Sequence, residues 1–183
     1  MPIQILLELS DADLEYFRGA MRGAQEKMRG RDEKLILSGA RQLARQTLGV
    51  TLPDFVRERL RELDTLTRML EDPDWRLEGA HRQRVLQALA YFADPSDLVP
   101  DLIPGLGLLD DAIMVELVAQ ELRPELESYA LFCAYREEQR SLDGADPADQ
   151  QHRLQERRRA MYARIETRRE ERARRGSWLS IFH

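Results

Sequence analysis

Residues 94–122 read DPSDLVPDLIPGLGLLDDAIMVELVAQEL and form the most apolar part of the chain. The second half of this stretch, residues 108–122, predicts a helix that is apolar on most of its sides. A helix that is apolar all round is stable only where other elements surround it, as in the centre of a helical bundle. The stretch therefore predicts an all-α fold with residues 108–122 at its centre.

The first half of the stretch predicts an irregular connection, because it contains three prolines and two glycines. Pro104-Gly105 fits the central positions of a type II turn. An aspartate at a helix start contributes about 0.3–1 kcal/mol, whereas burying one large apolar side chain contributes about 1.5–3 kcal/mol. We therefore interpret the connection as an apolar plug whose aspartates are structural. Its large apolar residues are Leu98, Val99, Leu102, Ile103, Leu106, Leu108 and Leu109.

Apolar residues at helical spacing predict further helices on both sides of this stretch. Ser10 with Asp13, and Thr51 with Asp54, have the spacing of capping boxes and predict two helix starts. The expected helices run from Ser10, from about Asp32 to Leu48, from Thr51 to about Asp72, from about Leu77 to Phe92, and from Pro124. The expected architecture is a single compact bundle of about six helices, followed by a basic C-terminal helix.

The core-facing residues of these helices follow from the same spacing. In the third helix we expect a buried stripe that includes Phe55, Val56 and Leu60. In the helix that begins at Pro124 we expect Ala130 and Cys133 to face inward. The expected buried face of the fourth helix also carries His81, which we interpret as a hydrogen-bonded core residue.

Composition points to a cytoplasmic protein. The single cysteine excludes an internal disulfide, and the N-terminal residues lack the basic and apolar regions of a signal peptide. Nor does the sequence contain the roughly 18 uninterrupted apolar residues of an ordinary transmembrane helix. We divide the chain into a helical domain over residues 1–142, a linker over residues 143–152 and a basic arm over residues 153–183.

The basic arm carries a charge opposite to that of the rest of the chain. Residues 153–175 hold ten arginines and four glutamates, although the whole chain has a net charge of −5. Arginine binds carboxylates in bidentate pairs, so the arm is expected to dock on an acidic surface of its own chain, a second copy or a partner protein. Its interleaved glutamates disfavour nucleic acid. The residues predicted to mediate association are Arg157, Arg158, Arg168, Arg169, Trp178 and Phe182.

The aspartates also allow a second interpretation, a cation site. Their carboxylates are the hard oxygen ligands that Mg²⁺ or Ca²⁺ prefers, but the calcium-loop motif is absent and neighbouring side chains on a helix diverge. No cofactor is predicted from the residues alone. The candidate ligands are Asp97, Asp101, Asp110 and Asp111.

Residues 89–111 resemble the signature of the YkvA-like family, whose pattern reads roughly Y-x-x-x-P-x-D-x-x-P-D-x-x-P-x-x-G-x-x-D-D. The resemblance covers about residues 88–125, and it implies a bacterial helical protein with no established activity, cofactor or catalytic residue. In some members the matching region looks apolar enough to be membrane-associated. The matched positions are Tyr91, Pro95, Asp97, Pro100, Asp101, Pro104, Gly107, Asp110 and Asp111.

Three functional hypotheses follow from these observations. The favoured one is a non-enzymatic helical interaction or scaffold protein, in which the C-terminal arm mediates association with a partner or with itself. The second is a divalent-metal protein, perhaps hydrolytic, that uses the aspartates. The third is a protein attached peripherally to a membrane through the plug or through the tail with Trp178 and Phe182.

Overall fold

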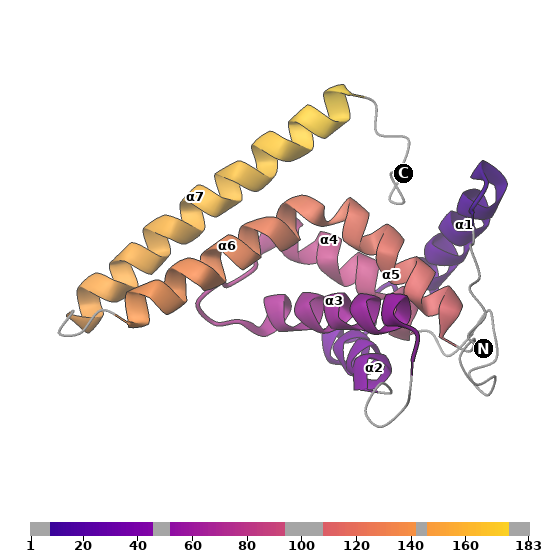
Figure 1. The fold of residues 1–183 in the computed structure, drawn as a ribbon, viewed down its shortest axis with the longest axis horizontal. Helices are drawn as coiled ribbons and strands as arrows, with labels where there is room; N and C mark the ends of the chain where they lie inside the picture. The colour runs from indigo at the N-terminus through magenta and orange to yellow at the C-terminus, as the bar shows by residue number, and fades with distance from the viewer. Residues whose placement is uncertain (1–7, 46–51, 94–107, 142–145, 176–183) are drawn as a thin grey trace.

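A computed structural model describes residues 8–45, 52–93, 108–141 and 146–175 of the chain (Figure 1). Within these segments the secondary structure is entirely helical, which confirms the predicted all-α class. The elements are α1 (Asp11–Met28), α2 (Glu33–Arg45), α3 (Asp54–Glu71), α4 (Gly79–Leu89), the 3-10 helix η1 (Tyr91–Ala93), α5 (Leu109–Glu121), α6 (Arg123–Arg140) and α7 (Pro147–Arg174).

Helix α5 is buried on nearly all sides, as its sequence predicted. Met114, Val115 and Val118 have no exposed surface, and the helix packs against α3 and α6. Leu122 ends α5 and at the same time precedes α6, whose first turn contains Pro124. Since proline is tolerated in a first turn but not inside a helix, it sets the break between the two helices.

The helix starts that the sequence predicted are confirmed in part. Ser10 caps α1: its hydroxyl accepts a hydrogen bond from the Asp13 backbone N–H, and the Asp13 carboxylate accepts one from the Ser10 backbone N–H. The capping box at Thr51 falls outside the described residues, and α3 begins after Pro53 without a side-chain cap.

Two expectations about buried residues are wrong. Phe55 is 40% exposed, and Ala130 is exposed as well. Phe55 lies in the first turn of α3, at the end of the helix. Ala130 lies about 100° around α6 from Tyr129, on the outer side of that helix. Val56 and Leu60 of the same α3 stripe are buried as expected.

Glycine determines how closely η1 approaches α2. A Cβ atom at Gly39 would lie 2.7 Å from the Ala93 Cα and 3.0 Å from the Phe92 carbonyl oxygen. No side chain fits at these distances, so the absence of a Cβ lets α2 contact the backbone of η1 directly. The segment that opens the YkvA-like pattern at Tyr91 is therefore seated against α2.

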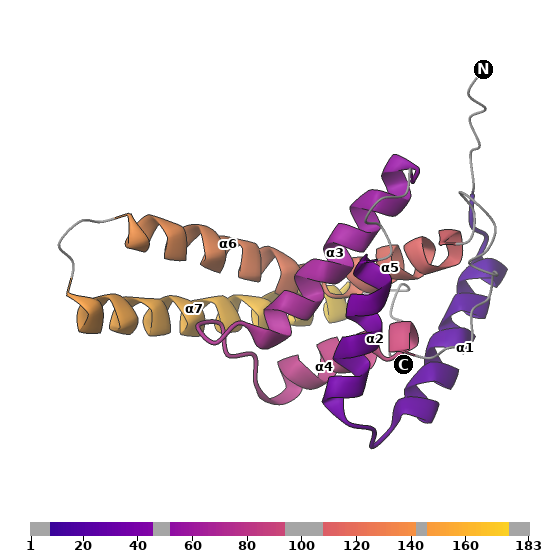
Figure 2. The same cartoon turned by 90° about the horizontal axis from the view of Figure 1, so that it is seen from below.

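Helices α6 and α7 form a long antiparallel hairpin whose end projects beyond α3 and α4 (Figure 2). Helix α7 begins at Pro147 because the Asp146 side chain accepts a hydrogen bond from the Ala148 backbone N–H. Residues 147–152, which the sequence assigned to a linker, are therefore helical.

Helix α7 has a narrow apolar stripe. Leu154, Met161 and Ile165 are buried. They belong to the same hydrophobic cluster as the residues of α1 to α6. Helix α7 is consequently part of the protein's core and not a separate appendage.

We expect Gly39→Ala to lower the free energy of unfolding by about 1–3 kcal/mol, the range for overpacking a tight contact. The matched control is Gly23→Ala in α1, where nothing lies within 4 Å of the added Cβ. That variant should raise the free energy of unfolding by up to about 1 kcal/mol, because alanine is the better helix former. Urea unfolding of both variants measures the two effects, and equal stabilisation would contradict the close approach.

Candidate functional site

Three of the nine pattern residues lie in the described part of the chain. Tyr91 is buried in η1, where its ring meets that of Phe92 edge-on at 5.2 Å. Asp110 and Asp111 occupy the first turn of α5, as predicted, and are only 5% and 7% exposed. Their carboxylates thus lie near the positive end of the central helix. The remaining pattern residues, Pro95, Asp97, Pro100, Asp101, Pro104 and Gly107, fall outside the described residues.

The cation site stays a prediction. Within residues 8–45, 52–93, 108–141 and 146–175, no group of three or more histidine, cysteine, aspartate or glutamate side chains is arranged to hold a metal ion. Asp97 and Asp101, which would have to join Asp110 and Asp111, are outside these ranges.

The arginines of α7 bind carboxylates and carbonyls of their own chain. Arg169 donates to the Glu125 carboxylate from Nε at 2.7 Å, and its Nη2 lies 2.6 Å from the same oxygen. Arg168 pairs with Glu127 on α6. Arg172 donates to the backbone carbonyls of residues 120 and 121, at 3.0 and 3.1 Å. These contacts fix the second half of α7 over the junction of α5 and α6.

The other two arginines predicted to mediate association also face the body. The Arg157 guanidinium lies over the Tyr135 ring, 5.2 Å from its centre. Arg158 donates to the Asp74 carbonyl at 3.3 Å. The four arginines selected from the sequence are thus used within the chain, and the two aromatic residues, Trp178 and Phe182, lie outside the described residues.

Glu125 is the most deeply buried acid of this interface. It has no exposed surface, and burial raises its pKa, with Arg169 offsetting only part of the effect. Arg84 on α4 approaches the same carboxylate at 3.4 Å. One buried acid therefore joins α4, α6 and α7.

His81 lies at the edge of this network, half-buried as a hydrogen-bonded residue. Its Nδ1 is 2.8 Å from Arg84 Nη2, which can only donate. The other ring nitrogen, Nε2, faces Glu166 of α7 at 3.2 Å. Its ring stacks on Tyr162 at 5.1 Å. Burial lowers the pKa of His81, and the charge of Arg84 adds to this, so a neutral imidazole fits the geometry.

A second polar cluster surrounds Asp72, at the end of α3. The Asp72 carboxylate accepts hydrogen bonds from Arg136 at 2.7 Å, from the Tyr129 hydroxyl at 2.9 Å and from the Trp75 backbone N–H at 3.1 Å. Burial opposes its ionisation, but the bonds from Arg136 and Trp75 outweigh burial and lower the pKa of Asp72. The sequence marked this residue only as a helix end, because its side-chain partners Tyr129 and Arg136 lie far away along the chain.

Trp75 follows Asp72 and is fully buried between α6 and α7. Its ring lies 5.4 Å from Tyr129, 5.1 Å from Phe132 and 5.0 Å from Tyr162. The Tyr162 hydroxyl donates to the Trp75 carbonyl at 2.8 Å, and burial raises the pKa of Tyr162 to about 12. The loop between α3 and α4 is thus fastened to both helices of the hairpin.

Cys133 lies beside this cluster and is not activated. It lines an open hollow of about 660 Å³ together with Asp72, Tyr129 and Arg136. Burial raises the pKa of the Cys133 thiol, so the nucleophilic thiolate is disfavoured. The acids of the hollow already have partners, since Arg136 binds Asp72 and Asp74 and Arg41 binds Glu71. We interpret the cluster as a structural fastening.

Comparison with known proteins places this helical bundle in a family. The family model described as "Protein of unknown function (DUF1232)" matches residues 84–117, which include the second half of α4, η1 and most of α5. The chain is 33% identical over 76 residues to the "Uncharacterized membrane protein YkvA" of Bacillus subtilis (strain 168), an alignment that covers 38% of this chain and 70% of that protein. The chain belongs to the YkvA-like family. No solved structure gives a significant match.

The relative is called a membrane protein, so the predicted cytoplasmic location is not supported. Among the helices of the described segments, none has both the length and the apolar character needed to cross a bilayer.

We expect the buried acid Glu125 to produce a specific pH dependence. Because its folded pKa is raised above that of the unfolded chain, its contribution to stability is largest at low pH and is lost as the pH rises through the folded pKa. Thermal unfolding of the wild type and of Glu125→Gln at pH 4 and pH 7 should therefore show a larger wild-type advantage at pH 4. The other titrating groups are common to both proteins and cancel. A larger advantage at pH 7 would show that Arg169 and Arg84 outweigh burial.

Proposed function

We propose that this chain is a non-enzymatic helical interaction protein that associates with a second copy of itself through the outer face of α7. The proposal is supported by one observation above all, the order of charges along that face. It refines the hypothesis that the C-terminal arm mediates association, because the arginines of the opposite face are occupied within the chain.

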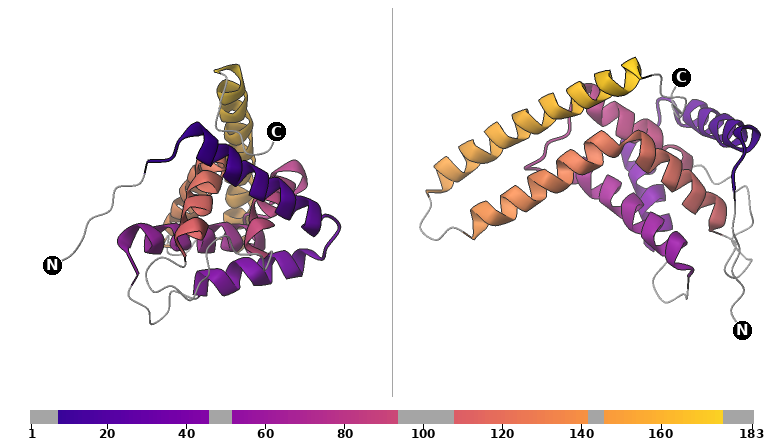
Figure 3. Two further views of the ribbon diagram at one scale, coloured as in Figure 1. Left: turned by 90° about the vertical axis from the view of Figure 1, so that its right-hand side faces the viewer. Right: turned by 45° about the horizontal axis from the view of Figure 1, so that its top comes forward.

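The outer face of α7 is a continuous exposed stripe. At 100° per residue its members fall within about 120° of one another, on the side of the helix opposite Leu154, Met161 and Ile165. Figures 1 and 3 show α7 lying along the outside of the molecule, so that this side is directed away from α6 and α4. The stripe consists of Glu156, Arg159, Ala160, Ala163, Thr167, Glu170, Glu171 and Arg174.

This stripe is complementary to itself in an antiparallel arrangement. When a two-fold axis relates two copies, each residue faces a partner position at the same distance on the other side of the axis. With the axis at the level of residue 165, Glu156 faces Arg174 of the other copy, and Arg159 faces Glu171. Each pair occurs twice by symmetry. The small side chains of Ala163 and Thr167 lie at the crossing point, where the two helices come closest.

Forming these contacts between two copies breaks only exposed ion pairs within α7. Glu156 and Arg159 are 3.0 Å apart within one helix, and Glu170 and Arg174 are 3.7 Å apart, and all four are exposed. Exposed ion pairs contribute about 0–1 kcal/mol, so exchanging partners costs little. Because the interface is polar, association is expected to be weak and to decrease as salt is added.

The test swaps the charges at positions 159 and 171 in the full-length protein. Sedimentation over a range of concentrations at low salt measures the dimer dissociation constant. Arg159→Glu places a glutamate opposite Glu171 at both symmetric positions and should raise the dimer dissociation constant about tenfold, the effect of roughly 1.4 kcal/mol. Arg159→Glu combined with Glu171→Arg restores both opposite-charge pairs and should restore dimerisation. The control is Arg61→Glu, a reversal at an exposed position of α3.

Circular dichroism verifies that each variant is folded. A wild-type chain that stays monomeric at every concentration contradicts the proposal. So does a dimer that the exchange variant fails to restore although Arg159→Glu weakens it.

A second candidate function is attachment to a membrane surface, which is supported by the description of the Bacillus subtilis relative as a membrane protein. Here Trp178 and Phe182 would supply the apolar contact and the neighbouring arginines the attraction to anionic lipid. Wild-type protein should then sediment with vesicles of phosphatidylcholine and phosphatidylglycerol, whereas the double variant Trp178→Ala/Phe182→Ala should stay in solution. Sedimentation that is unchanged in the double variant excludes the tail as the anchor.

A further inference from the structure

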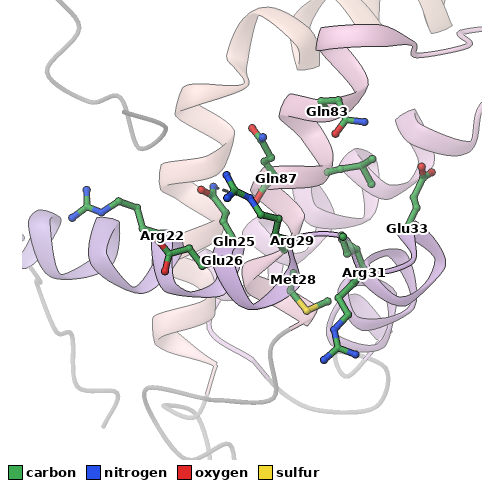
Figure 4. A pocket seen from close by; sticks show the side chains of 13 residues that line it. Arg22, Gln25, Glu26, Met28, Arg29, Arg31, Glu33, Gln83 and Gln87 are labelled. Atoms are coloured by element: carbon green, nitrogen blue, oxygen red, sulfur yellow. Dashed lines mark hydrogen bonds between the residues drawn. The ribbon is translucent and has the colours of Figure 1, made fainter.

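A cavity of about 490 Å³ opens between α1, α2 and α4, away from the contacts of α7 (Figure 4). Its apolar side is formed by Met28, Ile36, Leu86 and Ala90, all of them buried. Its remaining lining is polar. The volume lies within the range of about 300–1,000 Å³ that is typical of small-molecule sites, and so does the combination of an apolar surface with a few convergent polar groups.

Hydrogen-bond donors converge on this cavity from two helices. Figure 4 shows the Arg29 guanidinium directed toward the side chains of Gln25 and Gln87. Gln25 Nε2 donates to the Gln87 backbone carbonyl at 3.3 Å, which ties α1 to α4 and holds that amide at the cavity. Gln83 lies one turn before Gln87 on α4 and presents a third amide on the same face.

The turn between α1 and α2 adds a second cation. Gly30 adopts a φ of 74°, a conformation that residues with side chains rarely take. Arg29 and Arg31, on either side of this glycine, both line the cavity. Within the described residues, neither arginine forms an ion pair or a side-chain hydrogen bond.

One of the two acids of the lining is already bound by an arginine. Arg82 binds the Glu33 carboxylate, with Nε 3.3 Å from one oxygen and Nη2 in contact with the other. Glu26 is directed toward Arg22 and away from Gln83 in Figure 4. Arg22 in turn is bound by Glu15 at 2.8 Å. Figure 4 shows the Arg31 guanidinium directed away from the glutamine amides, so Arg29 is the cation that lies beside them.

We infer that this cavity binds a small molecule through a phosphate group. A phosphate presents three terminal oxygens, which match the Arg29 guanidinium and the glutamine amides beside it better than the two oxygens of a carboxylate would. The apolar side, formed by residues such as Met28 and Leu86, receives the uncharged part of the ligand. A soluble phosphate ester and a phospholipid headgroup share this chemistry, and the experiment distinguishes them. The site is independent of the α7 surface.

The experiment compares the wild type, Arg29→Gln and the control Arg61→Gln, all as full chains. In the first arm, calorimetry measures binding of glycerol 3-phosphate against glycerol at equal ionic strength. In the second arm, co-sedimentation measures binding to phosphatidylcholine vesicles with and without phosphatidic acid. Loss of one charge-assisted hydrogen bond should raise the dissociation constant about tenfold or more in Arg29→Gln. Arg61→Gln should bind as the wild type does. Arg29 is exposed, so its replacement leaves the core intact, and circular dichroism verifies this.

Saturable binding in the first arm that Arg29→Gln weakens identifies a soluble phosphate ester. Saturable binding only to vesicles with phosphatidic acid, again weakened by Arg29→Gln, identifies a lipid headgroup. The inference is overturned if neither arm saturates, or if Arg29→Gln binds as tightly as the wild type.

Discussion

Burial of α5 is the constraint on which the rest of the structure depends. A helix with apolar residues on nearly every side is stable only where other helices surround it. Helices α3 and α6 pack on it directly, and even the two aspartates of its first turn, Asp110 and Asp111, are buried. Each further helix needs only one apolar stripe, which explains why the other helices combine one buried face with highly charged outer surfaces.

The second level of organisation is the fastening of α7. Three apolar residues form too narrow a stripe to hold a helix of 28 residues securely. Arginines supply the difference, because a guanidinium can reach a carboxylate or a backbone carbonyl across a helix–helix gap while its stem still covers apolar surface. Arg169 and Arg84 both approach the Glu125 carboxylate and offset part of the cost of burying it.

The features that could be predicted from the sequence are those that depend on residues close together in the chain. The capping box of Ser10 and Asp13 and the all-round apolar pattern of α5 are local signals, and both correspond to the structure. Contacts between distant residues gave no such signal. In the sequence Gly39 looks like an ordinary helix position, and only the structure shows that Ala93 packs against it. Asp72 looks like a helix end, and only the structure shows that its partner is Arg136, 64 residues later.

The candidate site was harder to predict for the same reason. The arginines selected on the arm lie on the face of α7 that is turned inward, because their partners lie on α5, α6 and the loop after α3. The cavity between α1, α2 and α4 is assembled from three separate segments, of which each alone resembles an ordinary solvated surface. Only the positive φ of Gly30 has a local signature, the glycine itself.

The two ends of α5 carry opposite charges that oppose the helix's own polarity. Aspartates occupy the first turn, and Arg172 binds carbonyls at the last. The aligned peptide groups of a helix act as roughly half a positive charge at the start and half a negative charge at the end. Here both are neutralised inside the protein. The dipole of this buried helix is therefore offset by groups of the protein. Solvent, which cannot reach the helix, is not needed for this.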